Sequence, residues 1–380
     1  MKEIKIVIGA NFGDEGKGQM TDYFAAKAMQ DGKSCIVVCH NGSAQKGHTV
    51  TLDDGRSHIF HHFGAGSLAG ADTYFSSEFV LNPIFFRTEY MELMKKGVHP
   101  NLYVNPNCRI AIPGDILINQ EIETLRGNSR HGSCGYGFFE SILRNNESEY
   151  KTLFGDVAEN KNIYEKLYDI TYHYSLRRIK EAGIENPSSY LLGNLFDQKL
   201  IGRYIDDLMF MYAHCQLTSD EILRNYDSII FEGEQGLLLD EDNMEYFPHL
   251  TPSHTGIKNP YEILEALDME CDVEVCYVTR TYLTRHGAGR LDGECEKSEI
   301  NADMIDMTNQ PNEYQGSLRY AKLDVEKLFD RVNKDFSLVK TENYKMAIAV
   351  MHENEYQLPE LNSQKYHSNS PMRNSILAYG

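Results

Sequence analysis

The stretch Gly9-Ala-Asn-Phe-Gly-Asp-Glu-Gly-Lys-Gly-Gln19 follows an apolar run from Ile4 to Ile8 and decides how the fold is interpreted. A buried strand that ends in a glycine-rich turn and leads into a helix is typical of a phosphate-binding loop. The pattern is degenerate, because Asn11 and Gly18 stand where glycine and Ser/Thr are usual. A purely structural strand-to-helix turn is therefore the alternative.

The loop is expected to cradle phosphates with backbone N–H groups and with the cation of Lys17. The residues expected to contact phosphate are Gly13, Glu15, Gly16 and Gly18. Asp14 is unusual in such a loop, since a carboxylate beside phosphates needs a task. It can hold Mg²⁺, accept a proton, or do both.

Composition excludes several classes of protein. The chain has 380 residues, enough for a large α/β domain, and a formal net charge of −19. That charge argues against a general binder of nucleic-acid backbones or of anionic membranes. No apolar run is long enough for a membrane span and no signal-peptide pattern is found, so a soluble, cytoplasmic protein is expected.

Cysteines and histidines give little evidence for a metal centre. The eight cysteines are scattered without a Cys-x-x-Cys pair, which predicts reduced and mostly buried thiols. His58, His61 and His62 are close in sequence, but they lie in a β-like stretch whose alternate residues face opposite sides. Metal ligation by these histidines is the less favoured interpretation.

Short apolar runs recur along the chain and are followed by loop and helix signals. This rhythm predicts an α/β fold with a mostly parallel central sheet covered by helices. The predicted strands are Ile4–Ile8, Cys35–Cys39, Tyr74–Phe75, Ile229–Phe231, Val273–Val278 and Met346–Val350. Residues 150–225 show helical spacing and predict a helical insertion in a single domain of residues 1–380, whereas the polar stretch 293–316 predicts a mobile loop.

Four further motifs lie beyond predicted strands. Gly47-His48-Thr49 closes a glycine-rich turn, where His48 could transfer a proton or meet charge on a phosphoryl group. In Phe231-Glu-Gly-Glu-Gln235-Gly236, the amide of Gln235 suits a purine edge. Thr251-Pro-Ser-His-Thr255-Gly256 offers hydroxyls for a phosphate, and Thr284-Arg285-His-Gly-Ala-Gly289 adds a cation. Each motif alone could be an ordinary loop.

In this order the four motifs at residues 13–18, 47–49, 231–236 and 284–289 resemble adenylosuccinate synthetase, a family that joins aspartate to C6 of a purine nucleotide. The resemblance spans most of the chain. It implies Asp14 as general base and Mg²⁺ ligand, His48 as general acid, and the Gly47 carbonyl as a second metal contact. Lys17 would serve the phosphates while the purine O6 is phosphorylated and then displaced by the aspartate amine.

The resemblance assigns other positions by their place in the motifs. Ser133 and Cys134 fall in a loop that contacts the 5′-phosphate in the family, and Gln45 stands where an Asn is common. Arg144 resembles an arginine that reaches the phosphate from a neighbouring subunit, which implies a homodimer. The alternative for Arg144 is a solvated cation on a helix surface.

The aspartate-binding and donor regions depart from the bacterial pattern. The segment Asn312-Glu-Tyr-Gln315-Gly-Ser317-Leu-Arg319 looks like the archaeal and phage branch, which includes enzymes that make diaminopurine nucleotides from dGMP. Arg285, Gln315 and Ser317 are the candidates for aspartate binding, and Arg319 is assigned to the donor nucleotide. If the chain is of phage origin, the host cytoplasm is its expected location.

Asn354 stands near the position of an aspartate that reads guanine in GTP-using relatives. An amide suits the N1 and N6 edge of adenine, which favours ATP or dATP as donor, although Glu353 could still read guanine. Ser370 and Pro371 belong to a C-terminal motif that resembles the family's loop beside the donor base. A disordered tail is the alternative for this motif.

The choice of acceptor rests on opposing signals. Phage diaminopurine enzymes often have Ser at the position of Asp14, and this chain keeps the carboxylate. The preferred prediction is a ligase for dGMP, L-aspartate and ATP or dATP with Mg²⁺, and the alternative is adenylosuccinate synthesis from IMP with GTP. A noncatalytic nucleotide-binding regulatory module is the alternative from another class, although binding alone needs neither Asp14 nor His48.

Overall fold

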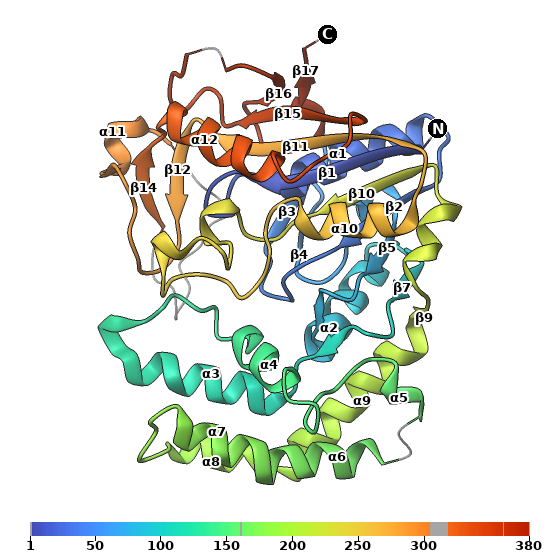
Figure 1. The fold of residues 1–380 in the computed structure, drawn as a ribbon, viewed down its shortest axis with the longest axis vertical. Helices are drawn as coiled ribbons and strands as arrows, with labels where there is room; N and C mark the ends of the chain where they lie inside the picture. The colour runs from blue at the N-terminus through green and yellow to red at the C-terminus, as the bar shows by residue number, and fades with distance from the viewer. Residues whose placement is uncertain (1, 160–161, 305–317, 360, 380) are drawn as a thin grey trace.

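The predicted strands form the centre of a ten-stranded sheet in a computed structural model, which describes residues 2–159, 162–304, 318–359 and 361–379 (Figure 1). The strand order is β17-β16-β15-β11-β1-β10-β2-β5-β7-β9. Their bounds are β1 (Lys2–Gly9), β2 (Cys35–Cys39), β5 (Asp72–Phe75), β7 (Leu102–Val104), β9 (Gln216–Leu217), β10 (Ser228–Glu232), β11 (Cys271–Arg280), β15 (Tyr344–Met351), β16 (Gln364–Ser368) and β17 (Leu377–Ala378). Neighbours pair in parallel except β16 with β17, so the predicted α/β class is confirmed.

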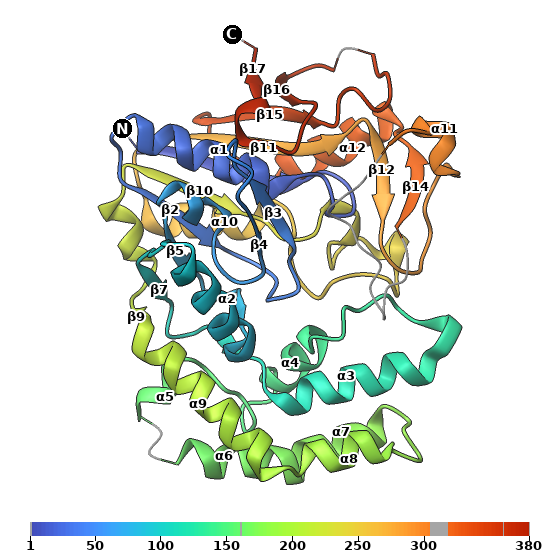
Figure 2. The same cartoon turned by 180° about the vertical axis from the view of Figure 1, so that it is seen from behind.

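Both faces of the central strands are buried, which explains why the apolar runs are continuous rather than alternating. Ile4, Ile6 and Ile8 pack on the face covered by α10 (Lys258–Leu267) and α12 (Val325–Phe336). Val7 points to the opposite face and packs with α1 (Lys17–Gln30). Figures 1 and 2 show α1 and α10 on opposite sides of the sheet.

Helices of the predicted insertion gather at one end of the molecule, drawn in green in Figure 2. They are α5 (Asp156–Glu159), α6 (Ile163–Asp169), a π-helical turn (Ile170–Ser175), α7 (Leu176–Glu181), α8 (Ser189–Leu195) and α9 (Gln198–His214). The remaining long helices are α2 (Pro83–Lys95), α3 (Pro113–Arg126) and α4 (Phe138–Asn145). Leu117 of α3 packs with Leu191 and Leu195 of α8, so the insertion shares an apolar cluster with α3.

Three smaller sheets and several short turns accompany the ten-stranded sheet. β3 (His48–Thr51) and β4 (Ser57–Phe60) form a hairpin, β6 (Val80–Leu81) pairs with β8 (Arg109–Ile110), and β12 (Tyr282–Arg285) and β13 (Glu294–Cys295) flank β14 (Arg319–Lys322). Short 3₁₀ turns cover Ala65–Ala69, Gly127–Ser129, Asp220–Asn225, Leu237–Leu239, Met244–Tyr246 and Arg373–Ser375. In the described parts, no helix has the length and apolarity needed to cross a membrane.

The prediction of a continuous loop over residues 293–316 is wrong for its first part. β13 and α11 (Lys297–Asn301) occupy that part, because β13 pairs with β14 and Ile300 packs against Tyr282. Residues 305–316 lie outside the described residues.

Asp335, in the last turn of α12, holds the turn that follows Thr255. Its carboxylate accepts hydrogen bonds from the Ile257 N–H at 3.2 Å and from the Tyr277 hydroxyl at 2.7 Å. A Cβ at Gly256 would lie 1.9 Å from Asp335 Oδ1, so glycine permits this approach. Burial raises the pKa of Asp335 to about 6.

The raised pKa predicts a specific pH dependence of stability. Asp335 binds its proton more tightly in the folded chain than in the unfolded chain, so its contribution is fully present below about pH 4 and is lost as the pH rises through about 6. Relative to Asp335→Asn, the wild-type free energy of unfolding should fall by about 2 kcal/mol between pH 4.5 and 7.5. Urea denaturation at both pH values measures this difference.

Asp330→Asn is the matched control, because Asp330 is exposed on the same helix. Its difference from the wild type should change little over the same range. Parallel stability curves for the wild type and Asp335→Asn would contradict the assignment.

Candidate active site at the carboxyl edge of the sheet

The ends of β1, β2 and β10 bring the predicted motifs together, because these strands are parallel neighbours. The contact is made by backbone. A Cβ at Gly236 would lie 2.4 Å from the Asn11 carbonyl oxygen, and one at Gly13 would lie 2.8 Å from the Cα of Gln235. The loop after β10 is therefore packed directly against the phosphate-loop motif, which only glycine allows at both positions.

The two carboxylates of the phosphate-loop motif face different ways. Glu15 is 3% exposed, and its Oε1 accepts hydrogen bonds from the N–H groups of Asn11 at 3.0 Å and Gly13 at 2.8 Å. Lys17 donates to the Gly13 carbonyl at 2.6 Å and lies 3.5 Å from Glu15 Oε2. The carboxylate of Glu15 is turned into the loop and binds the loop's own donors, so a phosphate contact at this residue, which its backbone N–H would have to make, stays a prediction.

Gly16 and Gly18 have structural reasons to be glycine. Gly16 adopts φ 108° directly before α1, a conformation that side chains disfavour. A Cβ at Gly18 would lie 2.7 Å from His48 Cβ, so the first turn of α1 lies against His48. The start of the helix and the candidate acid are thereby placed side by side.

Asp14 faces the edge of the site. Its side chain is 23% exposed, and His286 Nε2 lies 3.9 Å from Asp14 Oδ1. Burial, together with the charges of Asp14 and Glu234, raises the pKa of Cys134 to about 12. The loop that holds Cys134 also contacts the arginine-containing turn, since a Cβ at Gly287 would lie 3.0 Å from Gly132 Cα.

These residues fit a magnesium ion. Within the described part of the chain the Asp14 carboxylate accepts no hydrogen bond, and the backbone of Gly47 is exposed. Carboxylate and carbonyl oxygens are hard donors of the kind that Mg²⁺ prefers.

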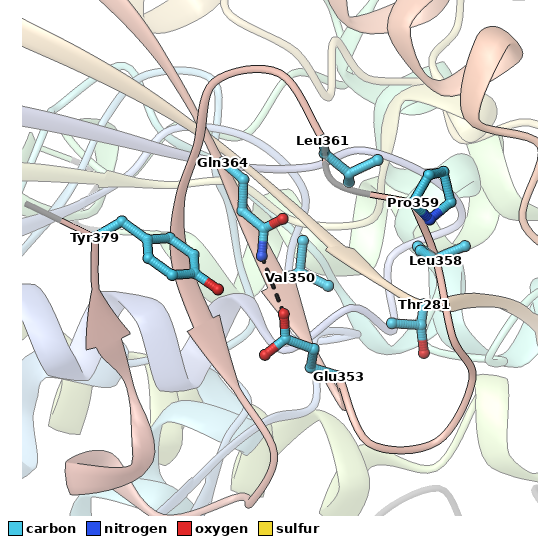
Figure 3. A pocket seen from close by; sticks show the side chains of 8 residues that line it. All are labelled: Thr281, Val350, Glu353, Leu358, Pro359, Leu361, Gln364 and Tyr379. Atoms are coloured by element: carbon cyan, nitrogen blue, oxygen red, sulfur yellow. Dashed lines mark hydrogen bonds between the residues drawn. The ribbon is translucent and has the colours of Figure 1, made fainter.

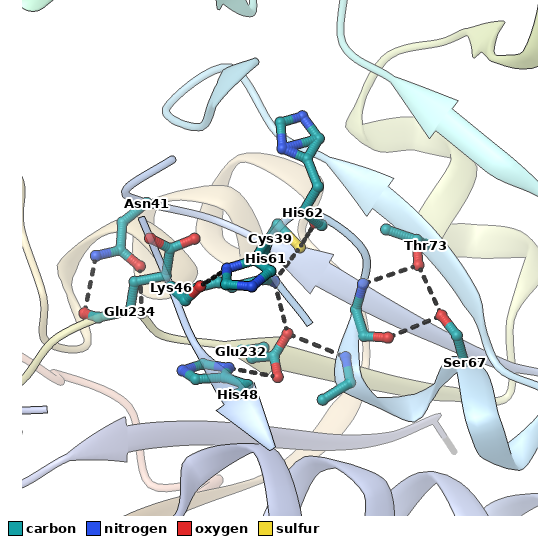
Figure 4. Close-up of polar contacts among 12 residues, drawn as sticks. Cys39, Asn41, Lys46, His48, His61, His62, Ser67, Thr73, Glu232 and Glu234 are labelled. Atoms are coloured by element: carbon teal, nitrogen blue, oxygen red, sulfur yellow. Dashed lines mark hydrogen bonds and ion pairs between the residues drawn. The ribbon is translucent and has the colours of Figure 1, made fainter. Parts of the chain in front are cut away.

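His48 is held by a buried ion-pair network at the end of β10 (Figure 4). Its Nδ1 lies 2.9 Å from Glu232 Oε1, while Lys46 Nζ lies 3.1 Å from Glu232 Oε2. The Ala65 N–H also donates to Glu232 Oε2 at 3.2 Å. Nearly all of this network is closed to solvent, which leaves the Nε2 side of the imidazole for a substrate.

The network shifts the pKa of each member. Burial alone would raise the pKa of Glu232, but Lys46 and His48 lower it to about 2. Burial lowers the pKa of His48 to about 4 despite the charge of Glu232. Although burial opposes it, the surrounding Cys39, Glu232 and Glu234 raise the pKa of Lys46.

Residues assigned to the nucleotide take different places in the structure. Ser133 Oγ donates to Asn119 Oδ1 at 2.9 Å, and the Thr255 hydroxyl donates to the Gly236 carbonyl at 3.1 Å. Both hydroxyls therefore shape loops of the site. Gln235 has φ 55°, and its Oε1 is buried without a partner among the described residues. Gln45 is half-buried at the start of the loop that carries His48.

The prediction that Arg144 reaches a neighbouring subunit is wrong. Arg144 is completely buried, and all five donors of its guanidinium are used inside the chain. It pairs with Asp115 at 2.9 Å and donates to the carbonyls of Tyr150 at 2.8 Å and Ile110 at 2.7 Å and to Thr152 Oγ1 at 2.8 Å. The alternative of a solvated surface cation is excluded by the same burial.

Two arginines, Arg285 and Arg319, lie near the predicted aspartate site. Arg285 is buried, its guanidinium lies 4.6 Å from the Phe12 ring, and its Nε has no partner in the described part of the chain. Burial and the nearby Arg319 lower the pKa of Arg285 to about 10. Arg319 pairs with Glu294 and donates to the Gly289 carbonyl at 2.8 Å. Gln315 and Ser317 lie outside the described residues.

The C-terminal motif is folded against α1, so the alternative of a disordered tail does not hold for it. Gln19 Nε2 donates to the Ser370 carbonyl at 2.9 Å and to the Met372 carbonyl at 2.8 Å, and Arg373 pairs with the buried Asp22. Pro371 is exposed beside this contact. The motif therefore lies next to the first turn of the phosphate loop's helix.

A cavity of about 460 Å³ lies beside the end of β15 and is lined by residues that include Val350, Glu353, Gln364 and Tyr379 (Figure 3). The carboxylate of Glu353 accepts a hydrogen bond from Gln364 at 3.2 Å and pairs with His367. The side chain of Asn354 is exposed one residue further on. Glu353 is thus already engaged, and Asn354 is accessible.

Several long-range partners could not be found from the sequence. Arg331 of α12 donates through Nε to the Ala10 carbonyl at 2.7 Å and through Nη2 to Asn11, so it secures the start of the phosphate loop. Glu232, Lys46, Glu234 and Asp335 were also missed as supports. Their acidic and basic residue types were visible, but nothing in the local spacing pairs them.

The clustered histidines do not converge on one site. His58 faces Glu89, His61 bonds the Lys46 carbonyl, and His62 Nε2 accepts from the Asn82 N–H. All eight cysteines are free thiols, as predicted. In the described ranges, the group with metal-ligand spacing is instead Asp240, Asp242 and His254.

Comparisons with known proteins agree with the motifs. The model of the adenylosuccinate synthetase family matches residues 6–318. Adenylosuccinate synthetases of *Aliivibrio fischeri* and *Thermoplasma volcanium* are 29% and 26% identical over 253 and 302 residues, which cover 66% and 79% of this chain. The chain spans 55% and 64% of the lengths of these two relatives.

Two solved structures share the fold. Fully ligated adenylosuccinate synthetase from *Plasmodium falciparum* gives a TM-score of 0.70 at 16% identity, and each chain is covered completely. Cyanophage S-2L succinoaminodeoxyadenylate synthetase, bound to dGMP and dATP, gives 0.62 at 14% identity and covers 100% of this chain and 95% of the phage protein. At these identities the likeness concerns the fold. With the family model matching most of its length, and the family's motifs meeting at one edge of the sheet, the chain belongs to the adenylosuccinate synthetase family.

Proposed function

We propose that this protein is a ligase that joins L-aspartate to C6 of a purine nucleotide, with dGMP as the preferred acceptor and ATP or dATP as the donor. The product is 2-amino-N6-succinyl-deoxyadenylate, released with the nucleoside diphosphate and phosphate. The observation that carries the proposal is the arrangement of three groups. The Asp14 carboxylate accepts no hydrogen bond from the described residues, and Lys17 is the first residue of the adjoining helix α1. His48 lies against that helix, and its Nδ1 is paired with Glu232.

The side chains divide the chemistry between them. Asp14 accepts the N1 proton, which makes O6 nucleophilic toward the terminal phosphoryl group of the donor. Glu232 holds the Nδ1 side of His48. Burial lowers the pKa of His48 to about 4 in the free chain, so the negative charge of a bound nucleotide would have to raise it before Nε2 can pass a proton to the charged oxygen of the transferring group. Lys17 neutralises the phosphates. The aspartate amine then attacks C6, its C–N bond forms, and the 6-phosphate leaves.

A magnesium ion would be held by Asp14 and the Gly47 carbonyl and would supply charge neutralisation for the phosphates. The two residues offer the oxygen donors that such an ion needs, as described above. Homodimer formation remains part of the proposal, but it no longer has support from Arg144, which is saturated within its own chain.

The dGMP assignment is supported by the segment that ends in Arg319, which resembles the phage branch. The cyanophage protein of the same fold is described as bound to dGMP and dATP. The retained Asp14 instead favours IMP, so adenylosuccinate synthesis from IMP with GTP is the second candidate. A cytoplasmic location, in the host if the chain is of phage origin, belongs to the same proposal.

Aspartate-dependent phosphate release tests the reaction and the acceptor together. The purified protein is assayed with dGMP, GMP and IMP, each combined with ATP, dATP and GTP, with and without aspartate. We expect release that requires aspartate and is fastest with dGMP. Asp14→Ala should reduce kcat by at least about 100-fold, since it removes the base.

The outcomes separate the candidates. Faster turnover of IMP than of dGMP refutes the substrate choice. Release that does not require aspartate refutes the ligase reaction, and absent release with every pair supports a noncatalytic binding module instead. Glu185→Gln is the matched control, because Glu185 is an exposed carboxylate in the helical insertion and its variant should keep wild-type rates.

Asn354→Asp should change the choice of donor. A carboxylate accepts from N1–H and the 2-amino group of guanine but offers no donor to adenine N1. We expect kcat/KM to fall about 10-fold for ATP and to rise for GTP. Initial rates with each donor at saturating acceptor measure the switch.

Glu353→Gln is the companion variant. Because Glu353 is engaged by Gln364 and His367, its change should leave the ATP to GTP ratio within about twofold. The opposite pattern, a switch in Glu353→Gln and none in Asn354→Asp, would assign the donor base to Glu353.

A further inference from the structure

Glu234, in the loop after β10, is a buried carboxyl group with one oxygen left over, and burial raises its pKa well above its usual range. It is 1% exposed, and its Oε2 accepts a hydrogen bond from the Ser43 N–H at 3.0 Å. A Cβ at Gly42 would lie 2.0 Å from the same oxygen, so the chain at 42–43 is shaped around this side chain. Oε1 is fully buried and has no partner in the described ranges.

The backbone fixes where this side chain starts. The Glu234 N–H donates to Asn41 Oδ1 at 2.9 Å, and Asn41 Nδ2 donates back to the Glu234 carbonyl at 3.2 Å. These paired bonds lock the loop after β10 to the loop after β2 (Figure 4). Glu234 is therefore as firmly placed as the strands themselves.

The surroundings of Glu234 are those of the candidate active site. Glu234 and Asp14 both act on the Cys134 thiol, which belongs to the loop assigned to the 5′-phosphate. The next residue, Gln235, also leaves Oε1 buried without a partner among the described residues. The loop after β10 thus holds two buried acceptor oxygens, one on Glu234 and one on Gln235, that no described residue satisfies.

An unpaired buried polar oxygen costs about 1–3 kcal/mol, so a donor is favoured at each of these oxygens, and a bound ligand could supply it. The base edge next to C6 offers one N–H in hypoxanthine, at N1. Guanine offers the same N1–H and two more N–H bonds on its 2-amino group. Once Asp14 has taken N1–H, only guanine has a donor left for a second carboxylate.

We propose that Glu234 is a specificity-determining residue whose Oε1 accepts a hydrogen bond from the exocyclic 2-amino group of the acceptor purine. This inference rests on the proposed function, because it names how that site tells dGMP from a nucleotide lacking the amino group. It also accounts for a dGMP enzyme that keeps Asp14. The 2-amino group is read by a neighbouring carboxylate, and Asp14 stays available as the base.

Glu234→Gln tests the contact with little structural change. The amide oxygen can keep the bond from Ser43, and the NH₂ group then replaces Oε1 and turns an acceptor into a donor. The matched substrates are dGMP and dIMP, which differ only in the 2-amino group. We expect kcat/KM for dGMP to fall on the order of 10- to 100-fold, and that for dIMP to change by less than about threefold.

Binding without turnover gives a second readout. Calorimetry with dGMP or dIMP alone should show the same selective loss of dGMP affinity in Glu234→Gln. Glu185→Gln is again the control, with both nucleotides unaffected. If Glu234→Gln does not fold, Glu234→Ala takes its place, with the same selective loss of dGMP expected.

Each outcome decides the inference. Equal losses of kcat/KM for dGMP and dIMP would mean that Glu234 only supports Ser43. No loss of kcat/KM for either nucleotide would mean that Glu234 does not contact the amino group. In both cases the proposed function still stands if the wild-type protein turns over dGMP. Wild-type preference for dIMP over dGMP would overturn the substrate assignment and the role of Glu234 together.

Discussion

The buried carboxylate of Glu232 is the constraint on which the site depends. It ends a central strand, has no access to water, and is compensated by Lys46, His48 and one backbone N–H. Removing one partner from a buried ion pair typically costs about 3–5 kcal/mol, because the remaining charge is left uncompensated. Lys46 and His48 are two residues apart, and both must reach the Glu232 carboxylate. The loop after β2 therefore has little conformational freedom. Through this loop the sheet fixes the imidazole, Gly47 and the approach of α1.

The sheet was predictable from the sequence, and the supports of the site were not. Parallel strands buried on both faces leave continuous apolar runs, which is why β1, β2 and β15 could be located within a few residues. Catalytic candidates were found because Asp14 and His48 stand in glycine-rich motifs after strands. Arg331 and Asp335 hold those motifs from α12, far away in the chain, and an exposed-looking charge on a helix gives no sign of such a partner.

Two charged side chains point where motif spacing could not show. Glu15 and Arg144 both use the hydrogen-bonding capacity of their side chains inside the chain. Spacing shows which residue types are near a turn but not which way a side chain points. The two adjacent acids of the phosphate-loop motif therefore differ in role. The Glu15 carboxylate accepts hydrogen bonds from the loop's N–H groups, and the Asp14 carboxylate is the candidate for chemistry.

Arg144 helps to fix the surroundings of the loop predicted to contact the nucleotide. It ties the start of α3, through Asp115, to the end of α4 and to the segment at Tyr150–Thr152, so the two helices that flank the loop at residues 127–137 are joined within one chain. That loop carries Ser133 and Cys134. Glu123 and Asn119 of α3 accept hydrogen bonds from Gly132 and Ser133, so contacts within one chain already shape the loop. An oligomer could add contacts to this loop, but it would receive the loop already built.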